Sequence, residues 1–191
     1  MAGTHKMGRL AGILPLLALV PLLSGCFEPS RGNFILPDKF RGVVFIFFNR
    51  EDGVACAKVN GLSEFVIPES GILYSKCSEP NNDLNSGIDY KFYFADDRDR
   101  QRPIELYVRR PGAKTIKPVD VDDPEKVLIY HVGYGGIHLN EGQSLEALPE
   151  YKAGETVRWL EFWVGTAPEY DSLYAMRERL SAHFFTFAKS K

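Results

Sequence analysis

Most of the apolar residues of this chain lie in short runs rich in β-branched and aromatic side chains, and such runs are typical of β-strands rather than helices. The clearest are residues 42–49, GVVFIFFN, and residues 156–164, TVRWLEFWV. In residues 88–95, IDYKFYFA, apolar side chains alternate with others, which predicts a strand with one buried face. Residues 103–109, PIELYVR, alternate in the same way after a polar turn, so the two segments are expected to form a hairpin.

Three more strands are predicted between these runs. They are residues 62–67, 71–75 and 126–132, each bounded by proline, glycine or polar residues. The segment 133–136, GYGG, is expected to end the last of them, because glycine adopts the positive φ angles of a bend at little cost. Short strands separated by turn residues favour an antiparallel β-sandwich.

After the last strand the apolar period changes from two to three or four, which predicts an amphipathic helix over about residues 168–189. Thr166 and Glu169 resemble a capping box at its start. The apolar positions at helical spacing are Tyr170, Leu173, Met176, Leu180, Phe184 and Phe187. The helix is expected to cover one face of the sheet. A helix lying on a membrane is the alternative, although its acidic residues would be repelled by anionic lipid.

The N-terminus has the layout of a secretory signal. Lys6 and Arg9 precede an uncharged apolar stretch, residues 10–23. That stretch is about 14 residues long, whereas a helix needs roughly 20 to cross a bilayer. Residues 1–25 are therefore expected to be a signal peptide that is removed from the mature chain.

The end of this leader, residues 23–26, reads LSGC and resembles the bacterial lipobox, an apolar residue and two small residues before a cysteine. The Cys26 thiol is the nucleophile that such a motif would use to attach a diacylglycerol. Residues 26–33 would then be a short tether to the domain. Two or three acyl chains on one cysteine give stable membrane anchoring.

These features predict a cell-envelope protein that is lipid-anchored on the extracytoplasmic side. Its first expected partner is membrane lipid, through acylated Cys26. By resemblance to Gram-negative sorting, Phe27 in place of an aspartate favours the outer membrane, if the cell has one.

Cys56 and Cys77 remain as a pair if Cys26 is acylated. An extracytoplasmic location permits a disulfide between them, and two free buried thiols are the alternative. Neither CxxC nor HxxxH spacing occurs, so no zinc site is expected.

The charge balance excludes one class of partner. Lys and Arg number 23 and Asp and Glu number 25, which gives a formal net charge of −2. Nucleic-acid binding needs a clustered excess of basic residues, so no nucleic-acid partner is expected. The hydrophobic content of 45% is sufficient for a core, and residues 34–191 are expected to form a single β-rich domain.

Four segments carry a resemblance to a family of bacterial lipoproteins that share a domain of unknown function. They are residues 34–37 (FILP), 42–46 (GVVFI), 67–73 (IPESGIL) and 90–94 (YKFYF). The resemblance covers residues 34–108 and implies a lipoprotein β-domain, with no activity attached. The chain also resembles, more loosely, the transthyretin-like sandwiches.

His131 and His138 flank the glycine-rich segment 133–136 and are the candidates for a catalytic or metal role. A metal would need a third ligand such as Glu141. No serine stands in a recognisable nucleophile motif. We therefore expect no cofactor, no metal and no catalytic residue. An envelope hydrolase or metal-dependent enzyme using His131 and His138 is kept as the alternative function.

The sequence thus favours a non-enzymatic binding or structural module of the envelope, with an envelope protein or a glycan as a further partner. An aromatic cluster is relevant to a glycan, because exposed rings can stack on sugars. Its members are Trp159, Phe162, Trp163, Tyr170 and Tyr174. Burial of this cluster in the core is the expected arrangement.

Overall fold

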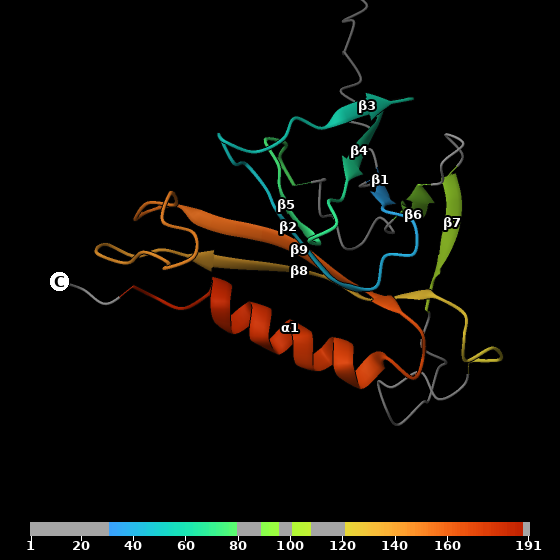
Figure 1. Ribbon diagram of the computed structural model, residues 1–191. Coiled ribbons are helices and arrows are strands. Elements are labelled where there is room, and N and C mark those ends of the chain that lie inside the picture. Colours follow the sequence, from blue (N-terminus) through green and yellow to red (C-terminus); the bar gives the residue numbers. More distant parts are fainter. Residues whose placement is uncertain (1–30, 80–88, 96–100, 108–120, 189–191) are drawn as a thin grey trace, which may run out of the picture.

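The computed structural model describes residues 31–79, 89–95, 101–107 and 121–188. Cys26 and the expected signal peptide lie outside these residues. The described part contains nine strands and one helix (Figure 1). The strands are β1 (Arg31–Leu36), β2 (Gly42–Phe47), β3 (Ala57–Val59), β4 (Leu62–Val66), β5 (Ile72–Tyr74), β6 (Asp89–Ala95), β7 (Gln101–Leu106), β8 (Leu128–His138) and β9 (Thr156–Gly165).

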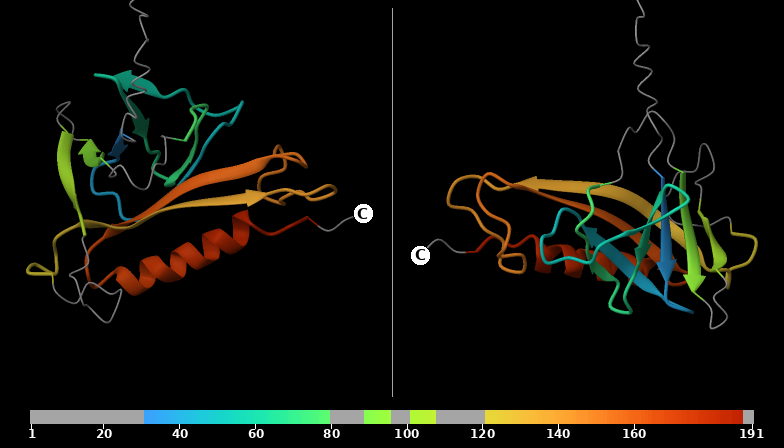
Figure 2. Two further views of the ribbon diagram at one scale, coloured as in Figure 1. Left: turned by 180° about the vertical axis from the view of Figure 1, so that it is seen from behind. Right: turned by 90° about the horizontal axis from the view of Figure 1, so that it is seen from above.

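All nine strands belong to one sheet in the order β3-β4-β1-β6-β7-β8-β9-β2-β5. The sheet is mixed: β1 runs parallel to both β4 and β6, β2 parallel to β5, and β7 parallel to β8. It curls so that its two ends lie at an angle to each other (Figure 2). The mainly β prediction with a C-terminal helix is confirmed. The antiparallel sandwich is wrong, because all nine strands form one curled mixed sheet in which four of the strand pairs are parallel.

The expected break at residues 133–136 is also wrong, since β8 passes through it and pairs with β9 along both halves. The register shifts between Tyr130 and Gly133, and His131 has a φ of 49° there. This irregularity bends the strand without ending it. Gly135 is needed because the indole of Trp159 packs directly on its backbone, and not because the chain turns there. A side chain at this position would overlap the indole.

The sheet separates two apolar cores. One fills the inside of the curl, and the other lies between the sheet and the helix. Every residue of β2 is buried because this strand has a core on each face, which explains its continuous apolar run. Side chains of the inner core include Phe34, Ile46, Phe65, Phe92 and Phe162; those of the outer core include Phe45, Phe47, Trp163, Leu173 and Phe184.

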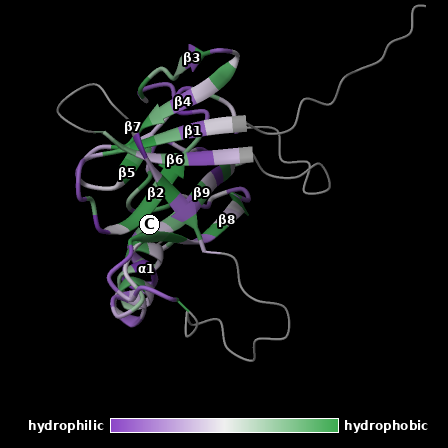
Figure 3. Ribbon diagram, turned by 90° about the vertical axis from the view of Figure 1, so that its right-hand side faces the viewer, coloured by the Kyte–Doolittle hydropathy of each residue, from purple (hydrophilic) through white to green (hydrophobic). Residues whose placement is uncertain are grey.

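The helix α1 (Tyr170–Phe184) lies within the expected range and packs on the outer face of β2 and β9 (Figure 3). The N-cap is Glu169 rather than Thr166, so the expected capping box is not formed, although the backbone N–H of Thr166 donates to the Glu169 carboxylate at 2.8 Å. The helix therefore covers the sheet, as the sequence predicted. In the described part of the chain, no helix is both long enough and apolar enough to cross a bilayer.

Candidate functional site

The two cysteines expected to form a disulfide lie at bonding distance in the structure. Their Cα atoms are 6.1 Å apart, and the backbone N–H of Cys56 points to the Cys77 sulfur. Cys56 directly precedes β3 and Cys77 follows β5, so the pair joins two connections near opposite edges of the curled sheet.

The structure separates the two histidines. Nε2 of His131 lies 3.1 Å from the Glu161 carboxylate, whereas Nδ1 of His138 lies 3.1 Å from the Thr156 hydroxyl. Both histidines are on β8, and seven residues of strand span roughly 23 Å. They cannot share a metal ion at that separation. No cluster of three potential ligands occurs among the residues that the structure describes.

Glu161 is the centre of a polar cluster between the sheet and the helix. Its side chain is only 4% exposed, yet it accepts hydrogen bonds from His131, from Trp159 Nε1 and from Arg177 Nε. Burial would raise the pKa of Glu161, but the hydrogen bonds from His131 and Arg177 and the positive charge of Arg177 outweigh it and hold the pKa below its ordinary value. The carboxylate is therefore ionised at neutral pH and joins β8, β9 and α1.

This cluster resembles part of an acid–base site, because a half-exposed histidine is oriented by a buried carboxylate. Its other features favour a structural role. The carboxylate charge is already balanced by Arg177, and the His131 ring stacks on the buried Trp163 at 4.8 Å. No described serine, threonine or cysteine forms a hydrogen bond with His131 that would make a nucleophile.

The aromatic cluster is buried in the core, as expected. Trp159, Phe162, Trp163 and Tyr170 are each less than a tenth exposed. Tyr174 alone is half exposed, and its ring centre lies 6.0 Å from that of Trp163. A flat aromatic platform for stacking sugars is therefore not formed by these residues.

A different site was missed in the sequence: a buried arginine between two tyrosine rings. Arg50 follows β2 and is 5% exposed. Its guanidinium carbon lies 4.6 Å from the ring centre of Tyr74 and 5.1 Å from that of Tyr151. Tyr151 is held in turn, because its hydroxyl donates to the Phe48 carbonyl at 3.2 Å.

Carboxylates complete the surroundings of Arg50. Its Nε and Nη2 atoms donate to both oxygens of Asp52 at 3.0 and 2.9 Å, and Nη1 forms an ion pair with Glu150. Hydrogen bonds from Arg50 hold the pKa of Asp52 below its ordinary value. Burial raises the pKa of Tyr151 to about 12, so its hydroxyl stays protonated at neutral pH. The bidentate pair and the two rings fix the guanidinium in one orientation.

Arg50 and its neighbours line a cleft of about 490 Å³ between the β2–β3 connection and the β8–β9 connection, which we call the Arg50 cleft. Its lining residues are Asn49, Arg50, Glu51, Asp52, Glu150, Tyr151, Lys152, Glu155 and Thr156. In the sequence, residues 49–53 read NREDG and carry no recognisable functional motif. The Arg-x-Asp spacing was a local signal, but the second wall comes from a distant loop that a single sequence does not place there.

Comparisons with known proteins leave the family open. The chain matches no protein-family model and no curated protein. A crystal structure described as "Putative Lipoprotein from Bacillus anthracis" is similar at a TM-score of 0.45 and 8% sequence identity, over 83% of this chain and 99% of that chain. The resemblance of residues 34–108 to a lipoprotein family stays a prediction.

Proposed function

We propose that this protein is a lipid-anchored, extracytoplasmic binding module of the cell envelope and not an enzyme. The anchor is Cys26, which follows a secretory leader and stands in a lipobox-like sequence. β1 begins at Arg31, within the expected tether of residues 26–33, so few residues separate Cys26 from the sheet. Four to five extended residues span about 15 Å, which keeps the domain close to the membrane surface.

The observation that carries the binding role is the fixed guanidinium of Arg50 in a cleft of about 490 Å³. Ligand sites are typically concave, largely formed in advance and lined by a few oriented polar groups. The Arg50 cleft has these properties, because the two tyrosine rings and the Asp52 and Glu150 carboxylates hold the arginine before any ligand arrives.

The lining favours a neutral, hydroxyl-rich ligand such as a glycan of the envelope. Its lining has four carboxylates against two cations, and Arg50 is already paired with Asp52 and Glu150, so the cleft disfavours an anionic ligand. Sugar hydroxyls both donate and accept hydrogen bonds. They can therefore pair with the carboxylates and with the lysine without bringing a net charge of their own.

The glycan is tested by titrating the full chain with a chito-oligosaccharide in a calorimeter. Glu51→Ala combined with Lys152→Ala removes two exposed lining groups and is expected to weaken binding about tenfold. Glu146→Ala, an exposed acid outside the cleft, is the control and is expected to bind like the wild type. Absence of saturable binding, or equal affinity in the double variant, would remove the glycan from this proposal.

The alternative, an envelope hydrolase or metal-dependent enzyme acting through His131 and His138, is not favoured by the geometry. The two histidines face different partners, and the carboxylate next to His131 is shared with Arg177.

A further inference from the structure

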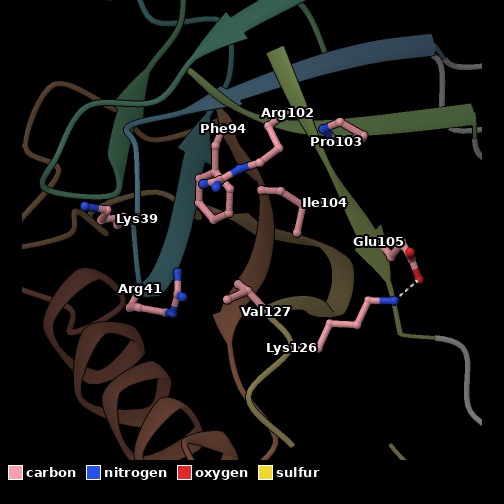
Figure 4. Close-up of a pocket in the computed structure, with 9 residues that line it drawn as sticks. All are labelled: Lys39, Arg41, Phe94, Arg102, Pro103, Ile104, Glu105, Lys126 and Val127. Atoms are coloured by element: carbon pink, nitrogen blue, oxygen red, sulfur yellow. Dashed lines mark hydrogen bonds and ion pairs between the residues drawn. The ribbon is translucent and has the colours of Figure 1, made fainter. Parts of the chain in front are cut away.

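A second pocket, of about 330 Å³, lies on the other part of the sheet and is lined mainly by cationic and apolar side chains (Figure 4). We call it the basic pocket. Its lining residues are Lys39, Arg41, Phe94, Arg102, Pro103, Ile104, Glu105, Lys126 and Val127.

Strand register brings these residues together from four segments. Leu36, at the end of β1, pairs with Phe94 on β6, and Phe94 pairs with Arg102 on β7. Lys39 and Arg41 lie in the connection between β1 and β2, and Lys126 comes just before β8. The pocket is thus built at the end of β1 that lies away from Arg31, where the chain enters the sheet.

The charge in the basic pocket is predominantly positive. Lys39, Arg41, Arg102 and Lys126 line it, against Glu105 as the single lining carboxylate. Glu105 lies 2.7 Å from the amine of Lys126 and neutralises that one group.

The three other cations keep most of their hydrogen-bonding capacity. Arg102 uses Nη2 to contact Asp38 at 2.9 Å, outside the lining. Arg41 donates from Nη1 to the Phe40 carbonyl at 2.8 Å, and its Nε is 3.7 Å from Glu169, which is longer than a good hydrogen bond. Lys39 forms no ion pair with any residue that the structure describes. An incoming anion would therefore find cations whose charges are only partly balanced.

Phe94 positions the two guanidinium groups. The guanidinium carbon of Arg102 lies 5.0 Å from the ring centre and that of Arg41 lies 5.9 Å from it. In Figure 4 the Arg102 side chain crosses the ring, and Arg41 lies on the side toward the helix. Cation–π contact with a buried ring restrains both side chains, so that their planar N–H groups are held close to the cavity.

We propose that the basic pocket binds an oxyanion, a phosphoryl or carboxylate group, through Arg41 and Arg102, with Ile104 and Val127 as apolar contacts for the body that carries it. Guanidinium groups recognise such anions through paired, charge-assisted hydrogen bonds. The volume is at the lower end of the range of ligand sites, which suits one small anionic group.

The position of the pocket distinguishes two sources of such a group. β1 spans roughly 17 Å from Arg31 to Leu36. If the tether holds Arg31 near the membrane, which rests on the proposed function, the basic pocket lies at the end of β1 that is farther from the anchoring leaflet. A soluble or polymer-borne anion then reaches it more readily than a headgroup of that leaflet.

The test uses the full chain reconstituted in phosphatidylcholine vesicles and titrated with inorganic pyrophosphate in a calorimeter. Saturable binding is expected, with Arg41→Gln and Arg102→Gln each weakening it about tenfold and the double variant abolishing it. Lys58→Gln combined with Lys76→Gln removes two exposed cations outside the pocket and is the control. Retained affinity in the double arginine variant, or an equal loss in the control, would overturn the proposal.

A second arm adds a minority of phosphatidylglycerol to the vesicles. If the pocket takes soluble anions, pyrophosphate affinity is expected to stay the same. If the pocket binds lipid headgroups instead, phosphatidylglycerol competes and pyrophosphate binding weakens in the wild type. That result would keep the oxyanion site and identify the lipid headgroup as the source of the anion. Folding of each variant is checked by urea denaturation. Neither arm depends on the Arg50 cleft, so failure here and failure of the glycan proposal are separable.

Discussion

Arg177 on α1 donates from Nε to the buried carboxylate of Glu161 on β9 at 3.0 Å, which makes a polar contact through an otherwise apolar interface between helix and sheet. Such a contact fixes the position of the helix, because a displaced helix would leave an ionised carboxylate without its cation.

Loss of the arginine is expected to destabilise the fold. Arg177→Gln should lower the free energy of unfolding by about 1–3 kcal/mol, since the buried Glu161 loses its counter-charge while water still reaches one side of the pair. Urea denaturation measures the change. Arg179→Gln, an exposed position on the same helix, is the control and is expected to stay within about 0.5 kcal/mol of the wild type. Equal effects of the two variants would contradict the role of Glu161.

The Glu161 pKa also predicts how stability depends on pH. Because the folded-state pKa is lower than the unfolded one, Glu161 stabilises the fold fully above its ordinary pKa and stops doing so as pH falls through the lowered value. Unfolding free energies measured from about pH 7 down to about pH 3 should therefore fall less steeply in Glu161→Gln than in the wild type. If the free energy of unfolding fell equally steeply with pH in both proteins, Glu161 would not be the group that causes this pH dependence.

Arg50 should stabilise the loops that form its cleft. In Arg50→Met an apolar chain still fills the space between Tyr74 and Tyr151, but the two cation–π contacts and the ion pairs with carboxylates are lost, at a cost of about 1–2 kcal/mol. The half-exposed Arg158, which forms an ion pair with Glu79, serves as the control, and Arg158→Met is expected to be nearly neutral. Thermal unfolding compares them, and a neutral Arg50→Met would contradict a preorganised cleft.

Two adjacent glycines of β8 should respond differently to alanine. A methyl group at Gly135 would overlap the Trp159 indole, whose ring stacks on Phe185 at 4.1 Å, so Gly135→Ala is expected to cost about 1–3 kcal/mol. At Gly136 the nearest atom to a new methyl is the Val157 carbonyl oxygen at 3.7 Å, and Gly136→Ala should be tolerated. Similar denaturation midpoints for the two variants would argue against close packing of Trp159 on β8.

Cys56 and Cys77 are predicted to be oxidised in the protein as purified. Reduction should add the mass of two hydrogens and lower stability by about 3 kcal/mol, the value for a closed loop of about 20 residues. Cys56→Ser combined with Cys77→Ser should unfold like the reduced wild type. Two thiols that react with an alkylating reagent before reduction would contradict the disulfide.

The sequence predicted the strands that have strong local patterns. A strand buried on one face has alternating apolar residues, and a strand buried on both faces has a continuous apolar run. Residues 42–49, 62–67 and 156–164 correspond to β2, β4 and β9. β1 was not recognised, since its first residues read as a tether.

Strand order and the sites could not be derived in this way. The parallel pairing of β1 with β4 and β6, and of β7 with β8, depends on contacts between distant segments. The same holds for Arg50, whose neighbours Tyr151 and Glu150 lie in the β8–β9 connection. For Gly135, the residue was noticed, but its reason is the indole on the neighbouring strand rather than a turn.

The central claim, an anchored module held by Cys26, is tested most directly by the intact mass of the protein extracted from bacterial membranes. A chain that begins at Cys26 and carries the added mass of a diacyl or triacyl group is expected, and Cys26→Ala should lose both the cleavage and the added mass. An unmodified chain that retains Met1 would contradict the anchor.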